Sequence, residues 1–488
     1  MSSPASVSQK HPRGLITLFF TELWERFSYY GMRAMLVLFM VDNMRGGLGL
    51  SDETATAIYG LYTAGVYLAS LPGGWVADRL IGARRAVLLG GIIIAAGHFT
   101  LALPNVRFFA LGLVLIVLGT GLLKPNISVL VGALYPEGGA RRDAGFTIFY
   151  MGINIGAAVG PILCSVLGER VGWHFGFAAA GIGMVIGLIV FVLTRNLLGS
   201  TGQLRADAPR LTPTQSNLLI GAAVALGGAL ILSLIGVIHF NPVTLARSAA
   251  GVIVAVAVFY FGSVYAFGHL DAAERKRVHV IVILFLSSAL FWAGFEQAGS
   301  SFNLFAARFT DRNFAGFEIP TGWYQSLGPI FVIAFAPVFA ALWVKLAAAQ
   351  KDPSLPVKFG LGLILLGLGF VVMAGATLVL KNGFKAGSTW LITTYLIHTF
   401  GELCLSPVGL SSVTKLAPKR FVGQMMGTWF LGSSLGNLLA GLLAGRIRME
   451  STHPNPSDFL NMLWIPLIAG ALLIFAAPVI KRWIGGAK

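Results

Sequence analysis

Long runs of apolar residues recur along almost the whole chain, and they restrict its fold more than any other feature. A membrane-crossing helix needs about 20 mostly apolar residues, and runs of this length fill most of the 488 positions. Lipid offers no hydrogen-bond partners, so each backbone N–H and C=O group must be paired within the run, as it is in a helix. We therefore predict an all-α polytopic membrane protein.

The composition indicates a surface that faces lipid rather than water. Hydrophobic residues make up 56% of the chain and charged residues only 11%, whereas a soluble domain carries about 25% charged residues. The formal net charge of +16 is spread in short groups between the apolar runs, with no basic cluster beside aromatic residues. That distribution is typical of membrane topology and argues against nucleic-acid binding.

Breaks rich in charge, proline or glycine divide the chain into fourteen predicted spans. The most polar linkers, at 196–213 and 268–277, group these spans as six, two and six. We predict an N-terminal six-helix bundle at 14–195, a linker with two additional transmembrane helices at 196–277, and a C-terminal six-helix bundle at 278–483. The predicted spans are 14–43, 52–80, 84–103, 107–131, 142–167, 173–195, 214–238, 243–267, 278–309, 321–348, 356–380, 387–415, 419–446 and 457–483.

The Lys and Arg residues outside the spans indicate the orientation. With the N-terminus inside, the inner segments hold 22 of the 35 basic residues, the outer loops hold 10, and three lie within spans. Basic residues are enriched on the cytoplasmic side of membrane proteins. We therefore predict a multi-pass protein of the cell inner (plasma) membrane with cytoplasmic N- and C-termini, and the compact loops favour a bacterial source.

Charged residues inside the predicted spans are few and costly. Each charge near the bilayer centre costs roughly 2.5–3.5 kcal/mol on insertion scales, so such residues normally face a cavity or a partner. A structural ion pair is the alternative for any single residue, but it explains the whole set poorly. The set comprises the acids Glu22, Glu25, Glu296 and Glu402 and the bases Arg26, Arg33 and Lys124.

The first span carries most of these charges as one polar stripe. Its members are Glu22, Glu25, Arg26, Tyr29, Tyr30 and Arg33. Their spacing places them on one face of a helix, which we expect to line an interior cavity. Two carboxylates close to an arginine also suit a proton site, because the cation favours the ionised carboxylate and burial favours the protonated one. A static salt bridge that steadies the helix is the alternative.

The two halves of the chain carry opposite intramembrane charge. The three bases lie in the N-terminal spans, whereas Glu296 and Glu402 lie in the C-terminal spans. A cavity between the halves would be positive on one wall and negative on the other, which suits a zwitterionic solute. Further polar and aromatic pairs lie one helical turn apart, although lipid-facing packing is the alternative for the two tryptophans. These pairs are Tyr150 with Asn154, Trp292 with Glu296, and Trp429 with Ser433.

Four stretches of the sequence resemble one family of membrane proteins. The segment Glu22-Leu-Trp-Glu25-Arg26-Phe-Ser-Tyr29-Tyr30-Gly31 is similar to the ExxERFxYYG signature of the proton-dependent oligopeptide transporter (POT) family of the major facilitator superfamily, and the segments around Lys124, Asn154 and Glu402 also resemble that family. The resemblance runs from about residue 14 to 480. It implies the major facilitator superfamily fold, with 12 core transmembrane helices in two six-helix bundles plus 2 extra helices between the halves, as in the bacterial members.

The resemblance also implies roles for individual residues. The residues implied in proton coupling are Glu22, Glu25, Arg26 and Glu296. The residues implied in peptide binding are Tyr29, Tyr30, Arg33, Lys124, Tyr150, Asn154, Trp292, Glu402, Trp429 and Ser433. Gln325 joins them as a candidate, because this chain has Gly328 where the family often has an asparagine before proline. We further expect Lys124 and Glu402 to form a gating salt bridge when the cytoplasmic side closes.

The expected function is proton-coupled import of di- and tripeptides by alternating access in a functional monomer. Protons are the coupling ion, and no cofactor or metal is expected. The alternative is the same fold carrying another small anionic or amphoteric solute, such as nitrate or an amino-acid-like metabolite. An enzyme is not expected, because His98, His174 and His398 are scattered and the two cysteines, Cys164 and Cys404, lie singly in apolar runs.

Overall fold

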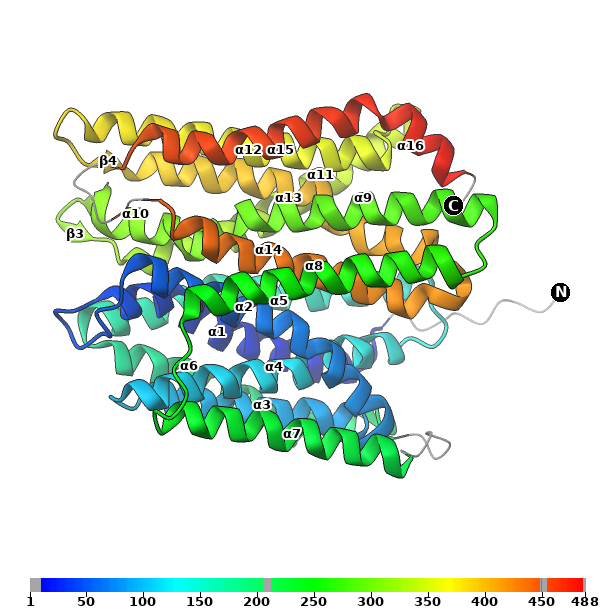
Figure 1. Cartoon of the computed structure of the whole chain (residues 1–488), viewed down its shortest axis with the longest axis horizontal. Coiled ribbons are helices and arrows are strands. Elements are labelled where there is room, and N and C mark those ends of the chain that lie inside the picture. Colours follow the sequence, from blue (N-terminus) through cyan, green and yellow to red (C-terminus); the bar gives the residue numbers. More distant parts are fainter. Residues whose placement is uncertain (1–9, 205–211, 448, 450–453, 486–488) are drawn as a thin grey trace.

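The chain forms long helices that run side by side along the molecule (Figure 1). The computed structural model describes residues 10–204, 212–447, 449 and 454–485. The first half contains α1 (Gly14–Val41), α2 (Asp52–Val76), α3 (Ala83–Leu101), α4 (Val106–Ala133), α5 (Gly139–Arg170) and α6 (Trp173–Thr194). Then follow α7 (Pro213–Leu234) and α8 (Pro242–Phe267). The second half contains α9 (Ala272–Phe295), α10 (Ser301–Phe309), α11 (Leu327–Ala348), α12 (Leu355–Leu380), α13 (Ser388–Leu416), α14 (Val422–Ala444), α15 (Pro456–Phe475) and α16 (Ala477–Ile484).

The prediction of an all-helical polytopic membrane protein is confirmed. Within the described residues, nine helices are long and apolar enough to cross a membrane. Helix α1 is not among them, because the charges of its polar stripe lower its hydropathy. Those charges are buried inside the protein, so α1 needs no uniformly apolar surface. The total of fourteen crossings therefore stays a prediction.

Several of the predicted continuous spans are in fact broken or include non-α turns. The span at 278–309 divides into α9, a 3₁₀ turn at Glu296–Gly299 and α10. The span at 321–348 begins with a 3₁₀ helix at Thr321–Ser326, and the last span divides at Ala476 into α15 and α16. Pro478 lies in the first turn of α16, where its missing N–H costs least. The first of these breaks has the largest consequence, because it lies at an intramembrane carboxylate.

Short strands gather at one end of the molecule. Strand β1 (Thr310–Asp311) pairs in parallel with β4 (Ala386–Gly387), and β2 (Asn313–Phe314) pairs with β3 (Phe317–Glu318) in an antiparallel hairpin. We call this the hairpin end, and we call the opposite end, where α1 begins and α16 finishes, the terminal end (Figure 1). The sequence analysis did not predict these strands.

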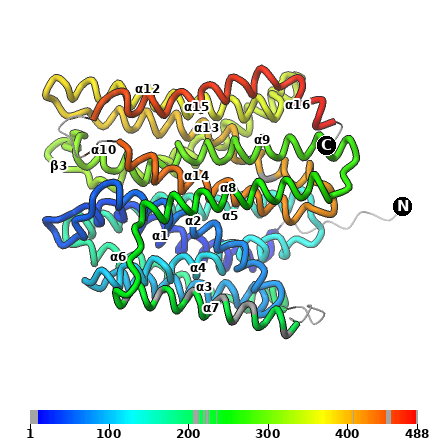
Figure 2. The backbone as a smooth tube through the Cα atoms, viewed as in Figure 1, coloured from blue at the N-terminus to red at the C-terminus, as the bar shows by residue number. Residues whose placement is uncertain are grey.

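The two halves are separate layers of helices that meet along a central interface (Figure 2). In the first half α1 packs against α5 and α6, and α3 packs against α4; in the second half α12 packs against α13 and α15. The halves meet chiefly where α2 contacts α14 and where α5 contacts α11 and the 3₁₀ helix before it. Helix α8 contacts both α2 and α14. The predicted domain boundaries remain predictions, and residues 205–211 of the predicted linker lie outside the described residues.

Candidate functional site

A cavity of about 270 Å³ lies between the two halves. This volume is near the lower end of the range for small-molecule sites, so the cavity suits a small solute. Both halves contribute side chains to its wall. The predicted site residues among them are Tyr30, Arg33, Tyr150, Asn154, Trp292, Glu296, Gln325 and Glu402.

A buried ion pair joins the halves at this cavity. The guanidinium of Arg33 on α1 lies 2.9 Å from a carboxylate oxygen of Glu296, which begins the 3₁₀ turn after α9. The hydroxyl of Tyr59 on α2 donates a hydrogen bond of 3.4 Å to the same carboxylate. Both charged side chains are buried. Removing one partner of a buried pair typically costs 3–5 kcal/mol, so each charge here depends on the other.

The sequence did not predict this pairing. It assigned Arg33 to the solute and Glu296 to proton coupling, and the two residues are 263 positions apart. The structure shows that the two groups are each other's partners. A carboxylate of a solute and the carboxylate of Glu296 would therefore compete for one guanidinium.

The carboxylates of the polar stripe form a second buried cluster. The Nε atom of Arg26 lies 3.1 Å from Glu22 and is also paired with Glu25. This cluster lies within the first half and does not line the cavity. Tyr29 is also outside the cavity wall; its ring stacks on Tyr62 at 6.1 Å between centroids.

The predicted gating pair is not formed in this structure. The Nζ atom of Lys124 lies 3.9 Å from the centroid of the Tyr67 ring, whereas Glu402 lines the cavity. Among the described residues no ion pair joins Lys124 to Glu402. The prediction concerns a state closed at the cytoplasmic side, so it stays a prediction.

Two predicted site residues lie away from the cavity. Trp429 and Ser433 are buried in α14, where the Ser433 hydroxyl donates to the carbonyl of Trp429. The edge of the Trp429 ring packs against Gly409 of α13, a position where a Cβ would collide with it. In this structure neither residue lines the cavity, and the Trp429 ring contributes to packing between α13 and α14.

Several cavity residues were missed by the sequence analysis. The rings of Tyr67, Phe295 and Tyr395 line the wall, and so does His398. The His398 ring nitrogen hydrogen-bonds the carbonyl of Leu366 at 3.0 Å. Tyr59 and Tyr67 lie eight residues apart in an apolar span, and this helical spacing could have indicated a second polar face.

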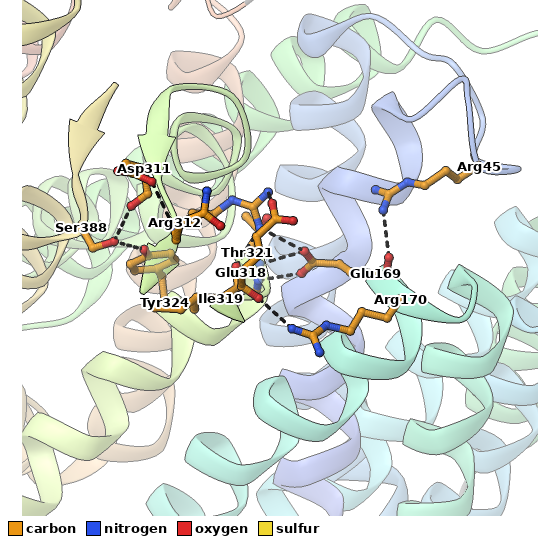
Figure 3. A network of polar contacts seen from close by, with 12 residues as sticks. Arg45, Glu169, Arg170, Asp311, Arg312, Glu318, Ile319, Thr321, Tyr324 and Ser388 are labelled. Carbon is orange, nitrogen blue, oxygen red and sulfur yellow. Dashed lines mark hydrogen bonds and ion pairs between the residues drawn. The ribbon is translucent and has the colours of Figure 1, made fainter. Parts of the chain in front are cut away.

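The hairpin end is closed by polar contacts between the halves. Glu169, near the C-terminus of α5, accepts hydrogen bonds of 2.8 and 2.9 Å from the backbone N–H groups of Thr321 and Gly322, as Figure 3 shows for Thr321. The carboxylate thereby caps the 3₁₀ helix of the opposite half. Arg170 donates to the carbonyl of Glu318 at 2.8 Å, and Arg312 lies 3.8 Å from Glu169.

A second closure lies between α2 and α10. Arg308 forms two hydrogen bonds, of 2.6 and 2.8 Å, with the carboxylate of Asp52. Helix α2 also packs closely on α14. At Gly441 of α14 a Cβ atom would lie only 2.8 Å from the Cα atom of Gly60 of α2, so a larger residue would not fit there. Every ion pair between α1–α6 and α9–α16 in the described part of the chain lies at the cavity or at the hairpin end. The structure is therefore closed at the hairpin end.

Comparison with known proteins identifies the family. The sequence profile of the POT family matches residues 84–456 of this chain. The chain belongs to the POT family. It is 43% identical over 486 residues to the peptide transporter YePEPT of Yersinia enterocolitica, covering 97% of this chain and 95% of that protein. It is 40% identical over 492 residues to a di-/tripeptide transporter of Lactococcus lactis subsp. cremoris, with 96% of each chain covered.

Solved structures of this POT family share the fold. The chain matches a crystal structure of the peptide transporter POT in complex with sulfate with a TM-score of 0.90 and 42% identity, covering 99% of this chain and 98% of that one. The predicted family and the major facilitator superfamily fold are therefore confirmed. The relatives are transporters, which agrees with the expectation that this chain is not an enzyme.

Replacement of Glu169 tests the closure at the hairpin end. Glu169→Ala removes the carboxylate that caps the 3₁₀ helix of the other half, so we expect the closed state to lose population. Spin labels at Met44→Cys and Phe384→Cys report this, because both positions are exposed at the hairpin end in opposite halves. We expect the distance distribution between the labels to broaden toward longer values.

The matched control is Glu137→Ala, which removes a carboxylate from the terminal end, where Glu137 pairs only with its helix neighbour Arg141 among the described residues. This control should leave the distance distribution unchanged. An unchanged distribution in Glu169→Ala as well would show that this contact does not hold the halves together.

Proposed function

We propose that this protein is a proton-coupled symporter that imports di- and tripeptides by alternating access. It acts as a monomer in the cell inner membrane, with both termini in the cytoplasm, so that the hairpin end faces outward and the cavity opens toward the terminal end. The observation that carries the proposal is the Arg33–Glu296 pair in the wall of a central cavity. The names of the relatives, a peptide transporter and a di-/tripeptide transporter, support the choice of solute.

The geometry gives a mechanism for coupling. With Glu296 ionised, Arg33 is occupied and the halves are joined beside the hairpin-end contacts. Protonation of Glu296 neutralises the carboxylate, so its attraction for the guanidinium falls and Arg33 becomes available to the peptide carboxylate. The proton and the peptide thus both favour separation of Arg33 from Glu296. Binding of either one therefore increases the affinity of the protein for the other, as linkage requires.

The opposite wall supplies a site for the peptide amine. Glu402 lines the cavity from α13, and no cation is paired with it in the part of the chain that the structure describes. An ammonium group can satisfy this carboxylate, whereas a purely anionic solute would be repelled by it. Asn154 and Gln325 add amide groups suited to the peptide backbone, and the aromatic wall accommodates varied side chains.

The cluster of Glu22, Glu25 and Arg26 serves as a further proton-coupling site in this proposal. It holds two carboxylates against one guanidinium, so one negative charge is in excess. Lys124 lies on the ring of Tyr67, which lines the cavity, and we assign the gating role to its positive charge. Its pairing with Glu402 would close the terminal end once the hairpin end has opened.

The membrane potential drives import, and no cofactor takes part. Moving one elementary charge across a potential of 100 mV yields about 2.3 kcal/mol.

Uptake into liposomes tests the proposed function. Purified protein reconstituted in liposomes should accumulate labelled dialanine when an inward proton gradient is imposed, because proton entry drives the peptide inward. A protonophore should abolish the accumulation. Failure to accumulate dialanine by protein shown to be folded and inserted would contradict the proposal, and uptake of labelled nitrate or of a labelled amino-acid-like metabolite would then identify the alternative solute.

Replacement of Glu402 tests the site for the amine. Glu402→Gln removes the charge proposed to bind the peptide ammonium, and a hydrogen bond to a charged group contributes about 1.5–3 kcal/mol. We expect the affinity for dialanine, measured by competition for uptake, to fall by about tenfold to a hundredfold. The affinity for N-acetyl-dialanine, which lacks the ammonium, should change little.

Glu137→Gln is the control, because this exposed residue at the terminal end does not line the cavity. It should leave both affinities at the level of the unmodified protein. Equal losses for dialanine and its acetylated form in Glu402→Gln would show that Glu402 does not recognise the amine.

A further inference from the structure

A basic pocket lies apart from the central cavity, at the terminal end between α3 and α6. Its volume is about 490 Å³. Three arginines line it: Arg84 and Arg85 at the start of α3, and Arg195 just after α6. The backbone segment 202–204 forms another wall, and no acidic residue is among the described residues that line it.

One arginine builds the pocket and the other two are free to bind. The guanidinium of Arg84 donates to the carbonyl of Gly199 at 2.8 Å and to the carbonyl of Arg195, and its backbone N–H donates to Gly202 at 2.9 Å. These bonds hold the segment after α6 across the start of α3. The pocket is therefore a defined part of the fold rather than a gap between mobile side chains.

The guanidinium groups of Arg85 and Arg195 have no partner within the described part of the chain. Both side chains are exposed, and no carboxylate is paired with either of them there. The first turn of α3 adds to the positive potential, because Gly82 offers it no side-chain cap. Like charges that share a pocket repel each other, so an anion bound between them would be stabilised.

The deeper wall of the pocket is apolar. Leu88 of α3 and Phe191 of α6 line it below the arginines. The exposed face of α3 that carries Arg85 continues toward the middle of the membrane with apolar side chains: Leu89, Ile92 and Phe99. An occupant that places an anionic group among the arginines and hydrocarbon along this face of α3 would match both parts of the site.

We propose that this pocket binds the headgroup of an anionic phospholipid, with the phosphate between Arg85 and Arg195 and the acyl chains along α3. Inorganic phosphate shares the anionic chemistry but not the apolar part, so the combination favours a lipid. Basic pockets between helices at the cytoplasmic face suit anionic headgroups in this way. The site is independent of the transported solute.

Lipid binding to the purified full chain tests this proposal. Detergent-solubilised protein is titrated with phosphatidylglycerol, with phosphatidylcholine and with inorganic phosphate, and bound lipid is counted by native mass spectrometry. The unmodified protein should bind phosphatidylglycerol more tightly than phosphatidylcholine or phosphate. Arg85→Gln and Arg195→Gln should each weaken phosphatidylglycerol binding about fivefold, and the double variant should weaken it more.

The control is the double variant Arg275→Gln/Lys276→Gln, which removes two exposed positive charges from the start of α9 at the same end of the molecule. It should bind phosphatidylglycerol as the unmodified protein does. Unchanged binding in Arg85→Gln/Arg195→Gln, or losses as large in the control, would overturn the proposal. Equal binding of phosphatidylglycerol and phosphatidylcholine, or of phosphatidylglycerol and phosphate, by the unmodified protein would overturn it without any variant.

Discussion

The buried ion pair between Arg33 and Glu296 is the interaction on which the rest of the structure depends. Two charges inside an apolar protein are costly unless they are paired, and here the two partners belong to different halves of the chain. Whether the halves stay together at this point is therefore linked to whether both groups are charged. A proton on Glu296, or an anion that binds Arg33, acts directly on the interface between the halves.

The surrounding structure places this pair where it can control access. The break between α9 and α10 brings Glu296 to the cavity wall, so that its carboxylate faces α1. From there to the hairpin end, the halves are joined by Asp52 with Arg308 and by Glu169, which caps the 3₁₀ helix at Thr321–Ser326. In the described residues the terminal end has no such ion pairs between the halves. Loss of the Arg33–Glu296 pair would therefore weaken the junction between the halves next to the hairpin end and favour closure at the terminal end.

Much of this arrangement could be predicted from the sequence, because helices in lipid are governed by apolar length and charged residues there are rare. The polar stripe of α1 was recognised by its helical spacing, and eight of the predicted site residues line the cavity. The partners could not be predicted, since spacing within a helix does not tell which distant segment faces it. The Arg33–Glu296 pair, the helix breaks and the capping role of Glu169 depend on tertiary packing. Trp429 illustrates the converse, because its spacing with Ser433 is helical but its ring packs against Gly409 and Phe359 inside the second half.

The central claim is that protonation of Glu296 couples the proton gradient to the movement of the halves, and Glu296→Gln tests it most directly. The variant carries a permanently neutral side chain beside Arg33. Reconstituted in liposomes, it should still exchange labelled dialanine for unlabelled dialanine across the membrane, because the cavity and its other groups are intact. It should no longer accumulate dialanine against a concentration gradient when a proton gradient is imposed. Proton-driven accumulation at the level of the unmodified protein would contradict the account.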